Sequence, residues 1–567
     1  MMSATPSLTH VQQKIDEVKR FLAIALSIAN AHTVEFYTHD VWSHFMDVAP
    51  EEVLSAVITH GVHQREHKCK ENATFGFCPE SHRLVNIFEM LEAARMHSLP
   101  GLGICLSREE LLLSMQQICS NSGSSTTNAD EFMNSKKSHE VQCMSEIVAH
   151  LAQGCQVKQI IDVGSGKGYL SSFLSMQYGL QVYGIDSSST NTHGAQERDR
   201  KLKKFSKAFQ QHSKEKKRNT PQGEIKSNNI TQTDKRTEVE KTEMPSSSGD
   251  DLPNVIEEHL EPDKTNQESS DDLFLNALSL DLIETTSLRA PSSQLTKEER
   301  EKRKQENLER KAQNSSSSEG PLFSPITSYV TAETELRELI SGLQAAVLVG
   351  LHTCGDLAPS SLRMFVAKTE LSAVCSVGCC YHLLSEEFDP TGSHAVNGFP
   401  LSQYLRDQSW FCGRNARMSA CLALERFSHG QGIPMESLFY RAVLHVILRD
   451  HYGSFKSEKR VGNVYSKSKS FVEYVRRALQ KLELDEAKLP DNEIQGYHDK
   501  YRLRMNELQA FSMLKLTLAP CIEGLILLDR LCYLKEQENV SFSALVQLFD
   551  PLLSPRCYAV IGLKKNR

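Results

Sequence analysis

Hydrophobic residues recur three and four positions apart through the first part of the chain, which is typical of amphipathic helices. The segment VQQKIDEVKRFLAIALSIANAH (11–32) has this spacing, and REELLLSMQQI (108–118) has it again behind a serine that favours a helix start. We therefore predict a helical N-terminal domain over residues 1–133. No apolar run approaches the roughly 20 residues of a membrane-spanning helix, so we expect no membrane partner.

From about residue 140 the pattern changes to short apolar runs that alternate with helical segments. Such alternation predicts a parallel sheet covered by helices, a Rossmann-like α/β fold. The predicted strands lie around 160–163 and at 181–186, 345–352, 371–378 and 558–565, and predicted helices lie at 334–344, 359–368 and 525–536.

A polar, repetitive segment interrupts this alternation from 206 to 320. Between residues 210 and 320 the only aromatic residue is Phe274. Such a composition buries too little apolar surface to offset its ordering entropy, so we predict a disordered insertion. The insertion divides one α/β domain into a first part, 134–205, and a second part, 321–567, with a basic helical region at about 430–520. A short apolar segment at 271–286, within the insertion, is a candidate binding site for a protein partner.

Charge and cysteine content place further bounds on the chain. The net charge of −7 excludes a protein that is basic as a whole, yet residues 401–567 hold 25 Lys and Arg against 18 Asp and Glu. The N-terminus lacks the pattern of a secretory signal, so we expect the 15 cysteines to stay reduced. Basic runs at 200–218 and 297–311 permit nuclear import, and we predict a cytoplasmic or nuclear protein.

The strongest chemical signal is a glycine loop between a predicted strand and a predicted helix. DVGSGKG places three glycines directly after the strand, and a second strand ends on an aspartate. Glycines let the backbone approach a ligand, and a carboxylate at a strand tip binds the hydroxyls of a ribose. The spacing is not the GxGxxG of dinucleotide sites, and no GxxxxGK[ST] loop is present, so S-adenosylmethionine remains as cofactor. The predicted cofactor-binding residues are Asp162, Gly164, Ser165, Gly166, Gly168 and Asp186.

These residues also resemble the motifs of a known family. DVGSGKGYLS followed by GID is similar to the first two motifs of class I S-adenosylmethionine-dependent methyltransferases. With KKSHEV (136–141), LHTCGDL (351–357) and VGCCYHLL (377–384), the chain resembles the methyltransferase-like protein 25 family. The resemblance implies a seven-stranded Rossmann-like class I methyltransferase sheet and a cofactor site at 162–168 and Asp186, but no particular substrate.

Two further motifs are expected at the carboxyl ends of the strands, where ligands bind in open α/β sheets. The predicted catalytic residues in HTCGD and GCCYH are His352, Asp356, Cys380 and His382. The HxCG and CCxH pair is similar to HLCG and CCHH of a transfer RNA 2′-O-methyltransferase family, and [DN]PP[YFW] of amino-group methyltransferases is absent. We therefore expect RNA as substrate, with a hydroxyl acceptor that one of these side chains deprotonates or orients.

The cysteines of these motifs admit three roles. A thiolate of Cys379 or Cys380 could attack a pyrimidine ring. Cys354, Cys379 and Cys380 with His352 and His382 could bind zinc, although adjacent cysteines are strained ligands and no CxxC occurs. Small cysteines also pack well beside a cofactor. We expect packing for Cys379, an acceptor pocket lined by Cys380 and His382, and no metal.

A second signal for RNA is the stretch from Arg449 to Arg477, which interleaves Lys and Arg with Tyr and Phe. Cations neutralise phosphates and aromatic rings stack on unpaired bases, so we predict an RNA partner there. A solvated helix face with core aromatics explains the pattern equally well. Methylation of a protein or small molecule, and a non-catalytic binding protein that retains the fold, stay open as alternatives.

Overall fold

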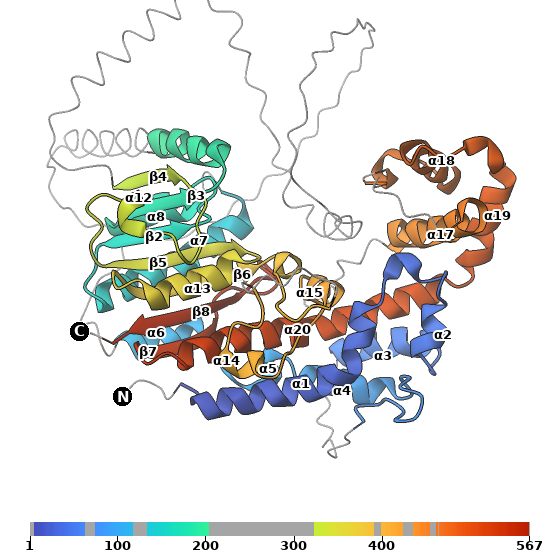
Figure 1. The fold of residues 1–567 in the computed structure, drawn as a ribbon, viewed down its shortest axis with the longest axis horizontal. Helices are drawn as coiled ribbons and strands as arrows, with labels where there is room; N and C mark the ends of the chain where they lie inside the picture. The colour runs from blue at the N-terminus through green and yellow to red at the C-terminus, as the bar shows by residue number, and fades with distance from the viewer. Residues whose placement is uncertain are drawn as a thin grey trace, which may run out of the picture. The chain divides into compact units, whose positions relative to one another are not determined.

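The computed structural model describes residues 5–62, 74–116, 133–202, 322–390, 398–422, 424, 435–453, 461–462 and 464–565. In this part of the chain eight strands form one sheet, in the order β1-β7-β8-β6-β5-β2-β3-β4 (Figure 1). The strands are β1 (Cys105–Ser107), β2 (Gln159–Val163), β3 (Gln181–Asp186), β4 (Phe323–Thr327), β5 (Ala346–Cys354), β6 (Leu371–Cys379), β7 (Val540–Gln547) and β8 (Tyr558–Lys564).

The sheet is parallel except at β8, which runs antiparallel to both β6 and β7. From β2 the chain adds β3 and β4 on one side, and then returns to add β5 and β6 on the other. The strand order therefore reverses between β2 and β5, and ligands of α/β sheets bind at such a switch point. This confirms the predicted Rossmann-like α/β fold, with β1 as a strand beyond the seven that the resemblance implies.

Strand β4 was not predicted from the sequence pattern. It pairs with β3 over its whole length, from Phe323 beside Val182 to Thr327 beside Asp186. It has only five residues, contains a proline and follows directly on the polar segment, so its periodicity is too short to predict a strand. The predicted insertion at 206–320 lies outside the described residues, between β3 and β4 in the chain.

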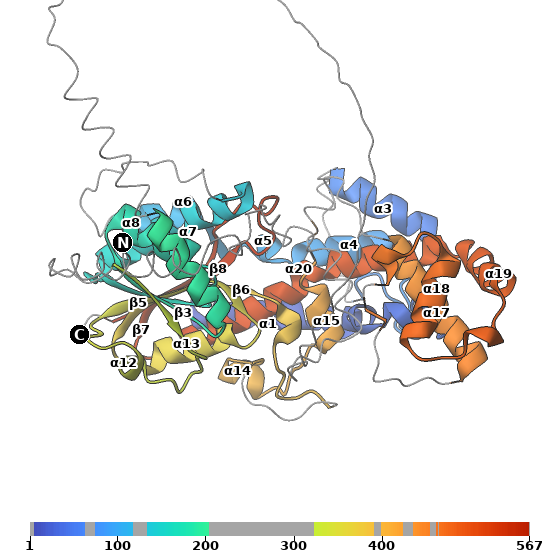
Figure 2. The same ribbon diagram turned by 90° about the horizontal axis from the view of Figure 1, so that it is seen from above.

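Helices cover both faces of the sheet, because alternate side chains of a strand point to opposite sides. Ile160 and Val182 pack in one cluster with residues of α7 (Ser135–Gly154) and α8 (Tyr169–Tyr178). Ile161 packs on the other face with residues of α13 (Leu357–Ala367) and α20 (Met505–Lys535). Figure 2 shows α7 and α8 on one side of the sheet and α13 on the other. The predicted helix at 334–344 forms only as α12 (Leu336–Leu339).

The long helix α20 joins the N-terminal helices to the sheet. It contacts α1 (Leu8–Asn30), α3 (Pro50–Val62) and α4 (Ile87–Met96), and it also contacts β7 and β8. In the described part of the chain it alone is long and apolar enough to cross a membrane, yet 94% of its most apolar window is buried inside the protein. A helix that is buried on all sides is apolar all round, so this composition is that of a core helix.

The remaining elements are shorter and mostly helical. Residues 189–202 form a further helix after β3. The others are η1 (Thr33–Glu35), α2 (Val41–Phe45), α5 (Leu99–Leu102), α6 (Arg108–Gln116), η5 (Tyr381–Leu383), α14 (Gln403–Arg406), α15 (Arg414–Ser419), α17 (Met435–Tyr452), η6 (Tyr465–Lys467), α18 (Phe471–Lys481), η7 (Glu486–Lys488) and α19 (Asp491–Arg502).

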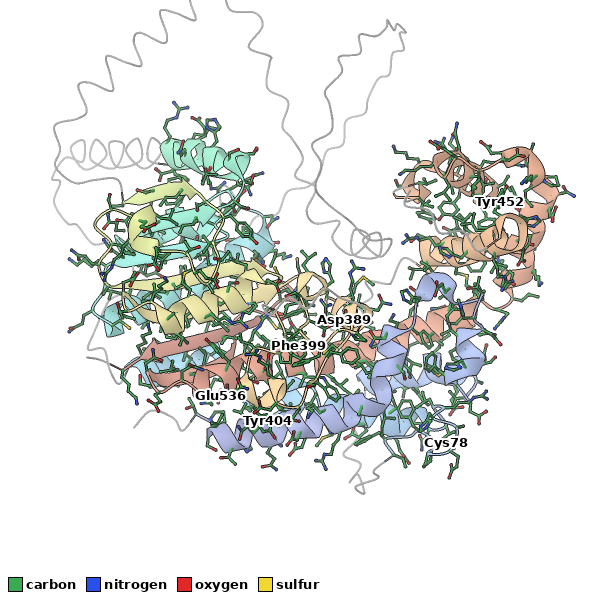
Figure 3. The ribbon with its side chains drawn as sticks, in the orientation of Figure 1. Cys78, Asp389, Phe399, Tyr404, Tyr452 and Glu536 are labelled. Atoms are coloured by element: carbon green, nitrogen blue, oxygen red, sulfur yellow. The ribbon has the colours of Figure 1, made fainter. Side chains whose placement is uncertain are left out.

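The segment that follows β6 is fastened to helices from both ends of the chain. The hydroxyl of Tyr404 in α14 donates to Asp16 of α1 at 2.6 Å, and its backbone N–H donates to Glu536 at 3.0 Å. Figure 3 labels Tyr404, Glu536 and the buried Phe399 in this region. These contacts fix the backbone that continues from the end of β6, where part of the predicted site lies.

Candidate active site

The loop between β2 and α8 turns at three glycines. Gly164, Gly166 and Gly168 have φ angles of 67°, 53° and 69°. The N–H of Gly164 donates to the carbonyl of Ile185 at 2.8 Å, which ties the loop to β3. At Gly168 a Cβ would lie 2.8 Å from the ring of Phe323, whereas at Gly166 it would meet no atom within 4 Å. The loop is therefore packed against β4 at its end and open at its centre.

Asp186, at the end of β3, contacts the same loop. Its Oδ2 accepts the N–H of Gly166 at 2.9 Å. Its Oδ1 accepts the N–H of Ser188 at 2.9 Å and the side-chain amide of Asn191 at 3.1 Å. A carboxylate offers about four lone-pair sites, so these three contacts leave one acceptor site for a ligand. The structure thus brings the predicted residues Gly166 and Asp186 together, and it adds Ser188 and Asn191, which no sequence motif marks.

Asp162, on β2 just before the loop, is buried and partly paired. The hydroxyl of Ser171 donates to its Oδ2 at 2.5 Å. Burial raises the pKa of Asp162 to about 7, the hydrogen bond from Ser171 opposes that rise, and the charge of Asp186 adds to it. Within the described part of the chain, the buried hydroxyl of Ser165 has no hydrogen-bond partner. Buried polar groups are normally paired, so this hydroxyl marks a place where a bound molecule would complete the site.

His352, near the end of β5, is joined to α7 by a buried carboxylate. Its Nε2 lies 3.1 Å from Oε2 of Glu140 and 3.1 Å from Nζ of Lys137. The hydroxyl of Ser554 donates to the other oxygen of Glu140 at 2.7 Å. Burial opposes ionisation of Glu140, but the hydrogen bond and charge of His352, with Lys137 and Ser554, hold its pKa below the usual range. Lys137 and Glu140 belong to KKSHEV, so this motif meets the predicted catalytic histidine.

Asp356 contacts the neighbouring loop. Its Oδ1 accepts the backbone N–H of Ser385 at 2.8 Å, which ties the loop after β5 to the loop after β6. A Cβ on Gly398 would lie 2.4 Å from the same oxygen, so the surroundings of this carboxylate are tightly filled. The contact positions the two loops, and the catalytic role of Asp356 stays a prediction.

The cysteines of the two motifs lie close together. Cys354 and Cys379 are direct partners across β5 and β6, with their sulfur atoms 2.9 Å apart. With Cys380 they form a group whose sulfur atoms all lie within 4.8 Å of one another. The sulfur of Cys421 lies 3.7 Å from Nδ1 of His382. The predicted acceptor-pocket residues Cys380 and His382 are therefore surrounded by further cysteines, one of which lies outside the sequence motifs.

The proton affinities of these thiols differ. Hydrogen bonds from Cys379 and Cys380 lower the pKa of the Cys354 thiol to about 4. The hydrogen bond with Cys354 raises the pKa of both Cys379 and Cys380. The thiolate of this group is therefore favoured at Cys354 rather than at the two residues considered as nucleophiles.

Arg417, from α15, holds the loop after β6. Its guanidinium donates to the carbonyls of Tyr381 at 3.2 Å and His382 at 3.3 Å, and also to the carbonyl of Leu384. It pairs with Glu386 at 2.9 Å, and both side chains are buried. A buried cation is tolerated when it is paired and hydrogen-bonded, as here, and the planar guanidinium fixes the backbone of the loop.

The predicted RNA-binding stretch is only partly accessible. Phe471 and Tyr474 are buried and pack against Tyr440, so their rings belong to a helical core in this structure. Lys467 and Lys469 are exposed. Residues 454–460 and 463 lie outside the described residues. Binding of RNA by this stretch stays a prediction, and its support among the described residues comes from cations rather than from these two rings.

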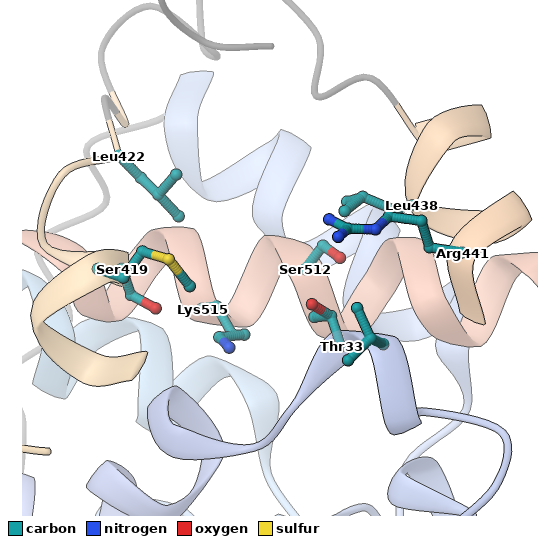
Figure 4. A pocket seen from close by; sticks show the side chains of 9 residues that line it. Thr33, Ser419, Leu422, Leu438, Arg441, Ser512 and Lys515 are labelled. Atoms are coloured by element: carbon teal, nitrogen blue, oxygen red, sulfur yellow. The ribbon is translucent and has the colours of Figure 1, made fainter. Parts of the chain in front are cut away.

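A pocket with a cationic lining opens among the helices (Figure 4). Its lining includes Thr33, Ser419, Arg441 of α17 and Lys515 of α20. The ammonium group of Lys515 donates to the carbonyl of Ala31 at 2.8 Å. None of the lining residues belongs to the glycine loop, so this pocket is distinct from the predicted cofactor site.

Comparison with known proteins identifies the domain to which these residues belong. A family model described as a methyltransferase domain matches residues 136–387, which contain the glycine loop, Asp186, His352 and the cysteine motifs. The fold and this match define a methyltransferase with a Rossmann-like sheet. No solved structure matches the chain.

Full-length relatives define the family more closely. The chain is 47% identical to "Probable methyltransferase-like protein 25" of Homo sapiens, across 100% of this chain and 99% of that protein. It is also 47% identical to the protein of the same name from Mus musculus, across 99% of this chain and 98% of that protein. The chain belongs to the methyltransferase-like protein 25 family.

Proposed function

We propose that the chain transfers a methyl group from S-adenosylmethionine to RNA, at a hydroxyl group. The observation that carries the proposal is the meeting of two groups at the carboxyl ends of adjacent strands. The glycine loop follows β2, and Asp186 ends β3. His352, which pairs with Glu140 of α7, lies near the end of β5. This is the switch point of the sheet, where ligands of α/β proteins bind.

The residues of the glycine loop fit a nucleoside cofactor. Gly166 lies beside open space, Asp186 retains an unused acceptor site, and the buried hydroxyl of Ser165 lacks a partner among the described residues. Asp186 would hold the ribose, and the loop backbone at 164–168 would lie against the rest of the cofactor. When bound, S-adenosylmethionine supplies an electrophilic methyl group on a sulfonium.

The acceptor must lose a proton during transfer, and in this proposal His352 receives it. With Nε2–H donating to Glu140, the free lone pair lies on Nδ1, which would take the proton of the hydroxyl. The buried carboxylate of Glu140 then stabilises the imidazolium, as a buried carboxylate does in other histidine pairs. The ammonium group of Lys137 donates to the same carboxylate at 3.0 Å and helps to keep Glu140 ionised.

RNA as the substrate class rests on two supports. HTCGD and GCCYH are similar to the motifs of transfer RNA 2′-O-methyltransferases, which act on a ribose hydroxyl. The last third of the chain is cationic, and Lys467 and Lys469 are exposed within it. RNA is present in both predicted locations, the cytoplasm and the nucleus.

Cofactor binding is tested by calorimetry on Asp186→Asn. The amide cannot accept as the carboxylate does, and a charge-assisted hydrogen bond contributes about 1.5–3 kcal/mol, so affinity should fall at least about tenfold. Glu197→Gln is the matched control, because Glu197 lies on the helix after β3 and pairs with Arg200 at the surface. Equal affinity in wild type and Asp186→Asn would contradict the ribose contact.

Methyl transfer is tested with total RNA from cells that lack the protein and labelled S-adenosylmethionine, followed by mass spectrometry of nucleosides. We expect label in a 2′-O-methylated nucleoside with the wild-type chain. His352→Ala should bind cofactor normally and lose transfer. Label in protein or in small molecules, with none in RNA, would refute the proposed substrate, and cofactor binding without any transfer would indicate a binding protein.

A further inference from the structure

Three cysteine sulfurs gather at the ends of β5 and β6. Cys354 and Cys379 face each other across the two strands, and Cys380 is the next residue along the chain. Among the described residues this is the only group of three or more Cys, His, Asp or Glu ligand atoms within 4.8 Å of one another. Side-chain groups of this kind are the usual starting point of a metal site.

The backbone departs from regular strand geometry where it brings these sulfurs together. Neighbouring residues of a strand point to opposite faces, so Cys379 and Cys380 would not share a ligand in an extended chain. Cys380 instead has φ 49° and ψ 50°, a left-handed conformation that is uncommon outside glycine. The pairing of β5 with β6 also shifts register between Gly350 and Thr353. Such irregularities re-aim side chains and are frequent at functional sites.

The surrounding structure holds this irregular backbone in place. The N–H of Gly355 donates to the carbonyl of Cys379 at 3.2 Å, and the N–H of Leu383 donates to that of Cys380 at 2.9 Å. The guanidinium of Arg417 holds the following carbonyls, including that of Tyr381. The three sulfurs are therefore kept together by contacts of the backbone, before any ligand is considered.

We infer that Cys354, Cys379 and Cys380 bind a zinc ion through their three sulfur atoms. Thiolates at about 2.3 Å from a tetrahedral zinc lie about 3.8 Å apart. The sulfurs of Cys354 and Cys379, at 2.9 Å, need to separate by about 1 Å, and the whole group lies within the 4.8 Å that such a site spans. Each thiol releases its proton to solvent and gives a sulfur electron pair to the metal.

Three neutral thiols that only fill space would not require a left-handed residue, Cys380, directly after the end of β6. The geometry therefore favours a metal over packing.

The zinc would clamp the ends of β5 and β6. Three protein ligands leave one position of a tetrahedral zinc open to a further ligand, and the inference is independent of the proposed substrate. The same strand ends carry His352 and Asp356, and the clamp would hold these residues in place.

The experiment measures zinc in the full-length chain, purified under reducing conditions, by mass spectrometry of the metal. We expect about one zinc per chain, and loss of nearly all of it in Cys354→Ser, Cys379→Ser and Cys380→Ser. Cys375→Ala is the matched control: Cys375 lies on β6 and is fully buried, so this change costs packing without removing a ligand. It should lower the melting temperature and keep the zinc.

Cobalt substitution of the wild-type chain gives a second measurement that does not depend on folding of the variants. Three thiolates should give the strong absorption bands of tetrahedral, sulfur-bound Co²⁺. His382→Ala should retain the metal. A reduced wild-type chain that neither contains nor takes up zinc would overturn the inference, as would full zinc in Cys354→Ser.

Discussion

The carboxylate of Glu140 lies 3.1 Å from Nε2 of His352, although 212 residues separate them in the chain. Helix α7 brings the carboxylate, and strand β5 brings the imidazole. The carboxylate is buried, and it is paired with the histidine, with Lys137 and with Ser554. A buried charge that loses its partners is strongly destabilising, so the pair supports the fold as well as the proposed chemistry.

Glu140→Gln should therefore lower the free energy of unfolding by about 3 kcal/mol near neutral pH. The pKa of Glu140 is lower in the folded state than in the unfolded state, so its stabilisation is present above the ordinary glutamate pKa of about 4.3 and is lost as the pH falls through the folded value. The difference in the free energy of unfolding between wild type and variant, measured with urea, should become smaller below about pH 4.3. Glu146→Gln, on the same helix but half exposed, is the control and should cost less than about 1 kcal/mol.

Asp162 should have the opposite dependence on pH. Its folded pKa is raised to about 7, so the folded chain holds a proton that the unfolded chain releases near pH 4, and this group lowers stability as the pH rises between the two values. Asp162→Asn copies the protonated form and still accepts from Ser171. The melting temperature of Asp162→Asn relative to wild type should therefore increase from about pH 4 to about pH 7 and then level off. A difference that is constant with pH would show that Asp162 does not take up a proton on folding.

The helices and strands could be predicted where the hydrophobic pattern of a single segment determines its structure. The buried strands β2 and β5 are continuous apolar runs, and the helix α13 has a clear apolar face, so each was predicted close to its observed bounds. Strand β4 could not be predicted, since five residues around Pro325 carry no periodicity and become a strand only beside β3. Strand β7 pairs along nearly its whole length with β8 and over Leu545–Gln547 with β1, and no local sequence pattern predicts these pairings.

The candidate site could also be predicted only where its residues lie close together in the sequence. Gly166, in the loop after β2, and Asp186, at the end of β3, are only twenty residues apart, so a single motif marks both. The N–H of Gly166 lies 2.9 Å from the carboxylate of Asp186. The contacts of His352 with Glu140 and of Arg417 with the loop after β6 join distant segments, and chemistry alone does not show which partner a buried charge will find. The αL conformation of Cys380 also has no sequence signal, because cysteine does not favour it.

Arg417 should be more sensitive to a conservative change than an exposed arginine. Lys cannot reach several carbonyls and Glu386 at once, so Arg417→Lys should cost about 2–4 kcal/mol in the free energy of unfolding. Arg406→Lys is the control, because Arg406 also pairs with a glutamate, Glu387, but is one-third exposed. It should cost less than about 1 kcal/mol. Equal losses in the two variants, measured by denaturant unfolding, would mean that Arg417 does not hold the loop.

The glycine loop allows a comparison in which backbone strain is the same and only the surroundings differ. Gly166 and Gly168 both have positive φ, so an alanine at either position pays a similar conformational cost of about 1 kcal/mol. At Gly168 the added Cβ would also lie 2.8 Å from Phe323, whereas at Gly166 it would enter open space beside the predicted cofactor. Gly168→Ala should therefore lose more stability, and Gly166→Ala should lose more affinity for S-adenosylmethionine. Thermal unfolding and calorimetry on both variants check this, and a Gly166→Ala chain that binds the cofactor as wild type does would place the cofactor away from the centre of the loop.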